Sequence, residues 1–154
     1  MFWKIGFFAL LALVILMVRV FMKVNPMMSE GSASWIDIYS KDKTATIKFL
    51  KEVFGTTVME SKASMSPGID YKVVKAKGQM WPFAGIMDLP DKKMPPHAMI
   101  YITVKDYAAA HKKMLKNGAK VMMADKYAGG MKFGIYIIPG GVDIGIAEWK
   151  RHDK

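Results

Sequence analysis

Residues 35–42 read WIDIYSKD, and residues 99–106, which lie 64 positions later, read MIYITVKD. Each stretch alternates along its length, as a half-buried strand does, and each ends at Lys-Asp. About three turns of helical pattern follow each stretch, then a glycine, then a short segment that ends in Val-Met. The chain therefore carries a repeated unit of a strand and a helix, and such a repeat constrains the whole architecture.

The residues at the ends of each helical pattern are typical of helix caps. Asp42 and Asp106 are suited to accept hydrogen bonds from the first free backbone N–H groups. Gly55 and Gly118 suit the left-handed conformation that ends a helix. The predicted elements are a strand at 35–39 and a helix at 43–54 in the first copy, and a strand at 99–104 and a helix at 107–117 in the second.

Three further strand-like runs follow each predicted helix. They lie at 57–60, 71–76 and 80–87 in the first copy, and at 120–123, 133–138 and 143–149 in the second. Each copy is then one βαβββ module. The sequence predicts an α+β fold in which two βαβββ modules form one cup-shaped domain.

The two faces of the repeated strand differ in chemistry. Ile36 and Ile38 point to one face, while Trp35, Asp37 and Tyr39 point to the other. In the second copy Ile100 and Ile102 oppose Met99, Tyr101 and Thr103. The aliphatic face suits packing against a helix, and the mixed face suits either the lining of a ligand cup or a core between the two modules.

The order and spacing of several motifs resemble a known superfamily. The motifs are FLKEVFG at the end of the first helix, YKVVKAKG, FAGIMDLP, PPHAMIYITVKDYAAAHKKMLKNGAKV and KFGIYIIPGGVDIGIAEW. Over residues 34–149 the chain resembles the vicinal oxygen chelate superfamily, and within it the glyoxalase and bleomycin-resistance-like group. The resemblance implies a cup-shaped domain of paired modules.

The resemblance also indicates where a metal would be held. Members that use a metal place His, Gln or Glu on four strand positions, which correspond here to Trp35, Gly85, Met99 and Gly145. None of these residues is a ligand for a hard or borderline divalent ion. The resemblance therefore implies a member of the metal-less subgroup, with no metal site and no cofactor, and the enzyme assignment leans towards no enzyme.

Two residues are candidates for acid-base chemistry, although no catalytic residue is assigned. His97 precedes the second copy of the strand, and Asp37 lies two residues beyond the first of the four metal positions. A histidine that merely caps the entrance of a strand is the alternative explanation of His97. The residues predicted to line a ligand-binding cup are Trp35, Asp37, Tyr71, Trp81, His97, Met99 and Tyr101.

The N-terminus has a different composition from the rest of the chain. Residues 5–22 read IGFFALLALVILMVRVFM, with Arg19 as the only charge, and span about 27 Å as a helix. This pattern predicts a single transmembrane helix that partners a lipid bilayer, and Arg19 and Lys23 favour a cytoplasmic domain. The alternatives are a signal peptide cleaved near residues 31–33 and a buried helix of a soluble protein.

Charge and cysteine content exclude some classes of function. The net charge is +10, and about +7 remains beyond the N-terminal segment, on 20 basic and 13 acidic side chains. The lysines are scattered and no aromatic-basic cluster occurs, so no nucleic-acid partner is predicted. Cysteine is absent, which excludes disulfides, thiolate metal sites and cysteine nucleophiles.

The predicted organisation is an anchor at 1–24, a Pro, Gly and Ser-rich linker at 25–33, the glyoxalase-like domain at 34–150 and a tail at 151–154. Three classes of function stay open. The first is a membrane-anchored, metal-independent module that binds a small organic ligand in its cup. The second is an accessory subunit of a membrane complex, with an integral membrane protein or a second copy as partner. The third is a lyase or isomerase that acts without metal.

Overall fold

The structure is a computed structural model that describes residue 13 and residues 29–61 and 70–148. The first module comprises β1 (Ala33–Ser40), α2 (Lys43–Phe54), β2 (Thr57–Glu60), β3 (Lys72–Lys75) and β4 (Ala84–Asp88). The second comprises β5 (His97–Val104), α3 (Tyr107–Lys116), β6 (Lys120–Ala128), β7 (Met131–Ile137) and β8 (Asp143–Glu148). The predicted α+β fold of two βαβββ modules is confirmed.

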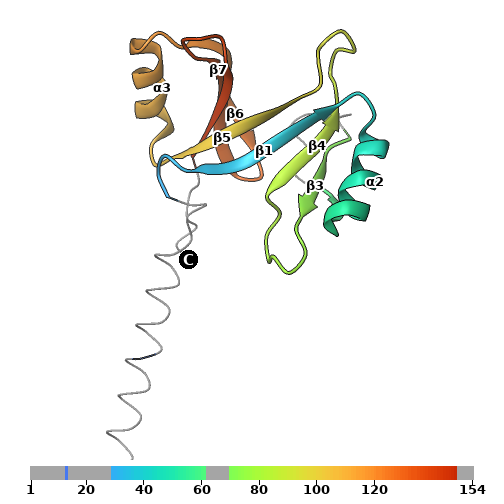
Figure 1. Ribbon diagram of the computed structural model, residues 1–154. Coiled ribbons are helices and arrows are strands. Elements are labelled where there is room, and N and C mark those ends of the chain that lie inside the picture. The colour runs from blue at the N-terminus through green and yellow to red at the C-terminus, as the bar shows by residue number, and fades with distance from the viewer. Residues whose placement is uncertain (1–12, 14–28, 62–69, 149–154) are drawn as a thin grey trace, which may run out of the picture.

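All the strands of both modules belong to one eight-stranded curved sheet in the order β2-β3-β4-β1-β5-β8-β7-β6. Within each module the first strand runs parallel to the last, β1 with β4 and β5 with β8. The modules join where β1 runs antiparallel to β5, side by side across the middle of the molecule (Figure 1). The strand order is the same in both directions from this junction, so the two modules are related by an approximate twofold axis.

The helices begin where the sequence predicts. The Asp42 side chain accepts a hydrogen bond from Ala45 N at 2.9 Å, and the Asp106 side chain accepts one from Ala109 N at 2.9 Å. Helix α2 is capped at its C-terminal end by Gly55, whose φ of 63° is the left-handed conformation expected there. Helix α3 ends one residue earlier than predicted.

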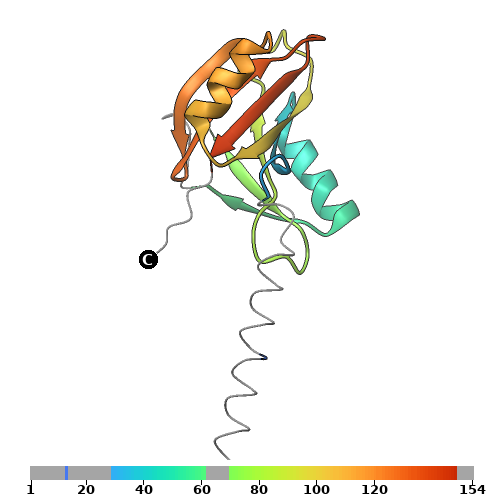
Figure 2. The same cartoon turned by 90° about the vertical axis from the view of Figure 1, so that its left-hand side faces the viewer.

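Each helix packs against the sheet of its own module through a separate apolar cluster. The cluster under α2 contains Val74, Ala84 and Ile86, with Ile36, Ile38, Ile47 and Leu50 packed against it. The cluster under α3 contains Tyr107, Ala119, Tyr136 and Ile146. Figure 2 shows α3 lying across the strands of the second module. A third cluster, of Met99, Tyr101, Phe133, Ile135 and Ala147, joins β5, β7 and β8.

Two predicted core contacts are not made. Helical spacing places Phe54 with Ile47 and Leu50, but its side chain is 61% exposed because α2 ends at this residue. Ile100 was expected to face a helix, as its partner Ile36 does, but it is 45% exposed. Ile100 lies next to the junction between the modules, and the two helices lie at opposite ends of the sheet (Figure 1).

The predicted localisation, a single-pass membrane protein with a cytoplasmic domain, is corrected by the structure. In the part of the chain that the structure describes, no helix is long and apolar enough to cross a membrane. The predicted transmembrane segment at 5–22 lies outside the described residues, apart from Leu13.

Candidate functional site

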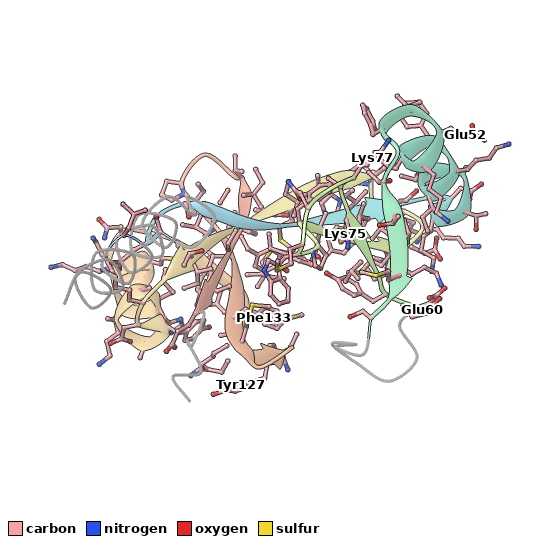
Figure 3. All side chains as sticks on the ribbon, turned by 90° about the horizontal axis from the view of Figure 1, so that it is seen from below. Glu52, Glu60, Lys75, Lys77, Tyr127 and Phe133 are labelled. Carbon is pink, nitrogen blue, oxygen red and sulfur yellow. The ribbon has the colours of Figure 1, made fainter. Side chains whose placement is uncertain are left out.

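A cavity of about 100 Å³ opens on the sheet face opposite the helices. Its β1 residues, Trp35 and Asp37, alternate with Ile36 and Ile38, which pack towards α2. The lining is almost wholly apolar and consists of Trp35, Asp37, Ser61, Tyr71, Val73, Tyr101, Ala128, Met131, Phe133 and Ala147. In Figure 3, Phe133 lies on the second-module side, and Glu60, the neighbour of Ser61, lies at the end of β2 on the other. Both modules therefore build the cavity.

Among the described residues of the lining, Asp37 is the only one with a charged side chain, and it is 1% exposed. Its Oδ1 accepts hydrogen bonds from Trp35 Nε1 at 2.9 Å and from Tyr71 Oη at 2.6 Å. Burial raises the pKa of this carboxyl, and the two hydrogen bonds offset part of that rise.

Tyr101 places a second buried polar atom near Asp37. The residue is 4% exposed, and its Oη is buried without a hydrogen-bond partner among the described residues. The hydroxyl lies near enough to Asp37 to help lower the pKa of that carboxyl, yet the geometry of a hydrogen bond is not met. An unpaired buried hydroxyl costs about 1 to 3 kcal/mol, and this one has almost no accessible surface of its own.

The phenols around Asp37 all stay protonated. Burial first, and the charge of Asp37 second, raise the pKa of Tyr39, Tyr71 and Tyr101 above the ordinary value of 10. A protonated phenol can donate a hydrogen bond at any pH at which the domain would work. The floor of the cavity is therefore one carboxyl surrounded by hydrogen-bond donors.

Two glycines make room for two of these phenols. Gly85 lies on β4 beside Asp37, and a methyl group there would overlap the hydroxyl end of Tyr71. Gly145 lies on β8 beside Tyr101, and a methyl group there would overlap the ring of Tyr101. Each phenol thus lies across a glycine of a neighbouring strand, which explains why these two strand positions carry no side chain.

Comparison with known families matches residues 32–144 to the Glyoxalase/Bleomycin resistance protein/Dioxygenase superfamily. The chain belongs to this superfamily. Among curated proteins, the "Putative glyoxylase CFP32" of Mycobacterium bovis is 29% identical over 129 residues, which are 80% of this chain and 48% of that protein. The Mycobacterium tuberculosis protein of the same name matches equally. The chain spans about half the length of these relatives.

Solved structures of other proteins share the fold. Methylmalonyl-CoA epimerase from Mycobacterium tuberculosis aligns with a TM-score of 0.59 and 16% identity, over 80% of this chain and 93% of that chain. A hypothetical protein from Bacillus halodurans aligns with a TM-score of 0.61 and 13% identity, over 82% and 99%. At these identities the likeness shows the fold alone.

The four positions at which the superfamily's metal-dependent members hold their ion surround the same floor. In the strand register, Asp37 pairs with Gly85 on one side and Met99 on the other, and Tyr101 pairs with Trp35 and Gly145. An indole, a thioether and two glycines do not fit a divalent ion that prefers carboxylate or imidazole ligands. In the part of the chain that the structure describes, no three His, Cys, Asp or Glu side chains form a group that could hold a metal.

Four of the seven residues predicted to line the cup of this superfamily domain line the cavity: Trp35, Asp37, Tyr71 and Tyr101. Met99 is buried beside them in the apolar cluster of β5, β7 and β8. Trp81 is 69% exposed and does not reach the cavity. His97 lies at the strand entrance, where its ring stacks on Tyr39 at 4.6 Å and Nδ1 contacts Pro95 O at 3.0 Å. The structure does not pair His97 with Asp37.

Six lining residues of the superfamily domain were not predicted from the sequence: Ser61, Val73, Ala128, Met131, Phe133 and Ala147. Ala128 and Met131 pair across the hairpin between β6 and β7, and the two residues of its turn, Gly129 and Gly130, have φ of 58° and 81°. The repeat could have identified Phe133, because the strand registers place it at the position that Tyr71 occupies in the first module.

Proposed function

We propose that the domain predicted at residues 34–150 binds a small organic molecule in this cavity without a metal ion. The ligand has a flat, apolar body and one polar group that meets Asp37. The observation that carries the proposal is an apolar, aromatic-walled cavity that has the buried Asp37 carboxyl in its lining. A carboxyl is costly to bury in its charged form, so a buried carboxyl beside a cavity is a candidate for a binding site.

The size of the cavity limits the buried part of the ligand. An engineered cavity of about 150 Å³ in another protein holds benzene, so about 100 Å³ suits a single small ring or part of one. The walls offer the faces of Trp35, Tyr101 and Phe133 for stacking, each contact being worth about 0.5 to 1.5 kcal/mol. With so few contacts, we expect an affinity no better than about 1 μM.

Several features support ligand binding over the other classes of function. A domain that serves only for docking has no need of an open cup, whereas a cavity remains here. Methylmalonyl-CoA epimerase of the same fold has been solved in complex with methylmalonyl-CoA. The residue types at Trp35, Gly85, Met99 and Gly145, which do not suit a divalent metal ion, support the metal-less subgroup for this chain.

The test is a titration of the protein with three single-ring probes: benzene, phenol and aniline. Binding is detected by changes in the NMR chemical shifts of the backbone amides. Asp37→Asn and Trp35→Ala should weaken binding of the best probe at least fivefold, because one removes the carboxylate and the other removes an aromatic wall. Trp81→Ala is the matched control, since Trp81 is 69% exposed and outside the cavity. If no probe shifts the amides around the cavity, or if Trp81→Ala weakens binding as much as Trp35→Ala, the proposal is wrong.

A second candidate function is a metal-free lyase or isomerase with Asp37 as the proton acceptor. One observation favours it: burial raises the pKa of Asp37, and a carboxyl tuned in this way is suited to proton transfer. The predicted partner His97 lies outside the cavity lining, so Asp37 would act alone. Exchange of a ligand carbon-bound proton with deuterated solvent, abolished by Asp37→Asn, would support this candidate.

A further inference from the structure

We infer that Lys43, the first residue of α2, is a positioning residue of the cavity, because it holds the chain at Asp70 and thereby sets the place of the next residue, Tyr71, in the cavity wall. The inference rests on the proposed function, since ligand binding is what the position of Tyr71 would alter. Lys43 is outside the cavity lining, so its effect on a ligand passes through Tyr71.

A buried ammonium group holds the residue before Tyr71. Lys43 is 6% exposed, and a lysine is almost never buried in this way unless it is paired. Its Nζ donates a hydrogen bond to the backbone oxygen of Asp70 at 2.8 Å and forms an ion pair with the Asp70 carboxylate. The hydrogen bond from this ammonium holds the pKa of Asp70 below its ordinary value. Lys43 therefore holds both the backbone and the side chain of Asp70.

Lys43 is itself fixed to the central part of the sheet. Its backbone N–H donates to Asp88 Oδ1 at 3.1 Å, and its Nζ lies 3.4 Å from Asp88 Oδ2. Asp88 is the last residue of β4, and it pairs with Ser40 on β1. The Lys43 side chain thus has a fixed base from which to hold Asp70.

Tyr71 depends on this contact because it precedes the paired residues of β3, which begin at Lys72. The Tyr71 backbone oxygen accepts one long hydrogen bond, from Ser61 N at 3.4 Å. The Tyr71 hydroxyl donates to Asp37 Oδ1 at 2.6 Å. A shift of the chain at Asp70 would therefore move the phenol in the wall and weaken its hydrogen bond to the carboxyl.

The second module has the same arrangement with other residue types. Tyr107 is the first residue of α3 and is 1% exposed. Lys132 Nζ lies 4.7 Å from the centre of the Tyr107 ring, within the range of a cation–π contact. Continuing the strand registers, Lys132 corresponds to Asp70, and the residue after it is Phe133, a ring of the cavity wall. In both modules the buried first residue of the helix contacts the residue that precedes an aromatic wall residue.

The test uses Lys43→Met, which removes the ammonium and keeps a long unbranched side chain. The side chains of Asp70 and Asp88 are 59% and 60% exposed, so water can replace the ammonium and no buried charge is left unpaired. Lys72→Met is the matched control. Lys72 lies on the other side of Tyr71 and also pairs with Asp70, but through the carboxylate, at 3.3 Å from Oδ1.

The first measurement is the dissociation constant of whichever of benzene, phenol and aniline binds most tightly, from NMR titration. Lys43→Met should weaken binding about fivefold, and Lys72→Met should change it less than about twofold. In a Tyr71→Ala background, Lys43→Met should cause no further loss, because the side chain that it positions is absent. Equal losses from Lys43→Met and Lys72→Met, or an undiminished loss in the Tyr71→Ala background, would overturn the inference.

The second measurement follows the ¹³C chemical shift of the Asp37 carboxyl through a pH titration and needs no ligand. The phenols that influence this carboxyl, on Tyr39, Tyr71 and Tyr101, have raised pKa values and stay protonated throughout. The hydrogen bond from Tyr71 lowers the pKa of Asp37, so its weakening in Lys43→Met should raise that pKa.

Tyr71→Phe should raise the pKa of Asp37 in the same direction, and Lys72→Met should leave it unchanged. A merely structural role for Lys43 would not move this pKa, so an unchanged value in Lys43→Met would overturn the inference. If no probe binds to the wild type and Lys43→Met still raises the pKa of Asp37, the proposed function is wrong, while the role of Lys43 in placing Tyr71 stands.

Discussion

The two modules place different chemistry on matching positions of the same backbone. Asp37 pairs with a glycine across β1 and β4, and Tyr101 pairs with a glycine across β5 and β8, so the carboxyl of one module corresponds to the phenol of the other. By the same registers, Tyr71 corresponds to Phe133. The hydrogen bonds from Trp35 and Tyr71 to the carboxyl come from the first module, and the second module supplies the rings of Tyr101 and Phe133. The repeat thus sets the arrangement of the backbone, and the polarity of the site comes from the positions at which the two copies carry different residues.

The largest expected effect concerns the two glycines. Gly145→Ala should destabilise the fold by about 3 kcal/mol and Gly85→Ala by about 2 kcal/mol in urea unfolding. The added methyl at Gly145 meets the base of the Tyr101 ring, which can move only if β5 moves, whereas the methyl at Gly85 meets the free end of Tyr71. A Tyr101→Ala background should remove most of the cost of Gly145→Ala. Equal losses of stability from Gly85→Ala and Gly145→Ala would contradict the difference between the modules.

The next effect concerns Asp37, which has no acidic counterpart in the second module. Burial raises its native pKa above the ordinary value of 3.8, so between these two values the folded state binds more protons than the unfolded state. The contribution of Asp37 to stability is therefore greatest below about pH 3.8 and is lost as the pH rises through the native pKa, by about 1.4 kcal/mol for each pH unit that separates the native pKa from the ordinary one. Asp37→Asn should lack this loss.

Urea unfolding of wild type and Asp37→Asn at a series of pH values checks this prediction. The stability of the wild type minus that of the variant should fall as the pH rises above 3.8. A difference that stays flat or increases with pH would mean that the hydrogen bonds from Trp35 and Tyr71 outweigh burial in setting the pKa.

A smaller effect separates Tyr71 from its counterpart. Tyr71→Phe removes the 2.6 Å hydrogen bond to Asp37 and should cost about 1.5 kcal/mol. Because that bond lowers the pKa of Asp37, its loss should also shift the pH dependence of stability upwards. The reciprocal change, Phe133→Tyr, should bring no stabilisation, since Asp37 is already bonded from the first module. A gain in stability from Phe133→Tyr would show that the modules are interchangeable at this position.

The smallest effect tests where the modules remain alike. Asp42→Ala and Asp106→Ala should each cost about 1 kcal/mol, because each removes one 2.9 Å cap bond at the start of a helix. Thermal unfolding of both variants measures this. Costs that differ by more than about 1 kcal/mol would show that the two helices contribute unequally.

The sequence predicted the fold well because each element carries its own signal. The bounds of α2 and β2 agree with the prediction at both ends, since Asp42 and Gly55 cap the helix and a turn follows. The run predicted at 80–87 begins later, at Ala84, and the strand predicted at 120–123 extends to Ala128. Strand ends depend on partner strands that lie far away in the sequence, and β6 also contains two shifts of register.

Most of the candidate-site residues that the sequence predicted lie on the repeated strands. Trp35, Asp37 and Tyr101 follow from alternation on β1 and β5, and Tyr71 was placed from its strand-like run. Trp81 was predicted from its large aromatic side chain alone, and the structure places it before β4, largely exposed and outside the cavity lining. The wall from β6 to β8 was missed because its residues are ordinary core types, Ala, Met and Phe, which carry no local signal of a cavity.

The hairpin between β6 and β7 has a consequence for how the binding range of this domain could diversify. Its two turn residues, Gly129 and Gly130, both have positive φ, as the tight two-residue turn that matches strand twist requires. The residues on either side, Ala128 and Met131, form part of the cavity wall. Insertions at this tip would lengthen the wall and reshape the mouth of the cavity, while the ladder of eight strands and the carboxyl at its centre stay unchanged. Ligand specificity can then change through the length of this one turn, while the residues that stabilise the fold stay the same.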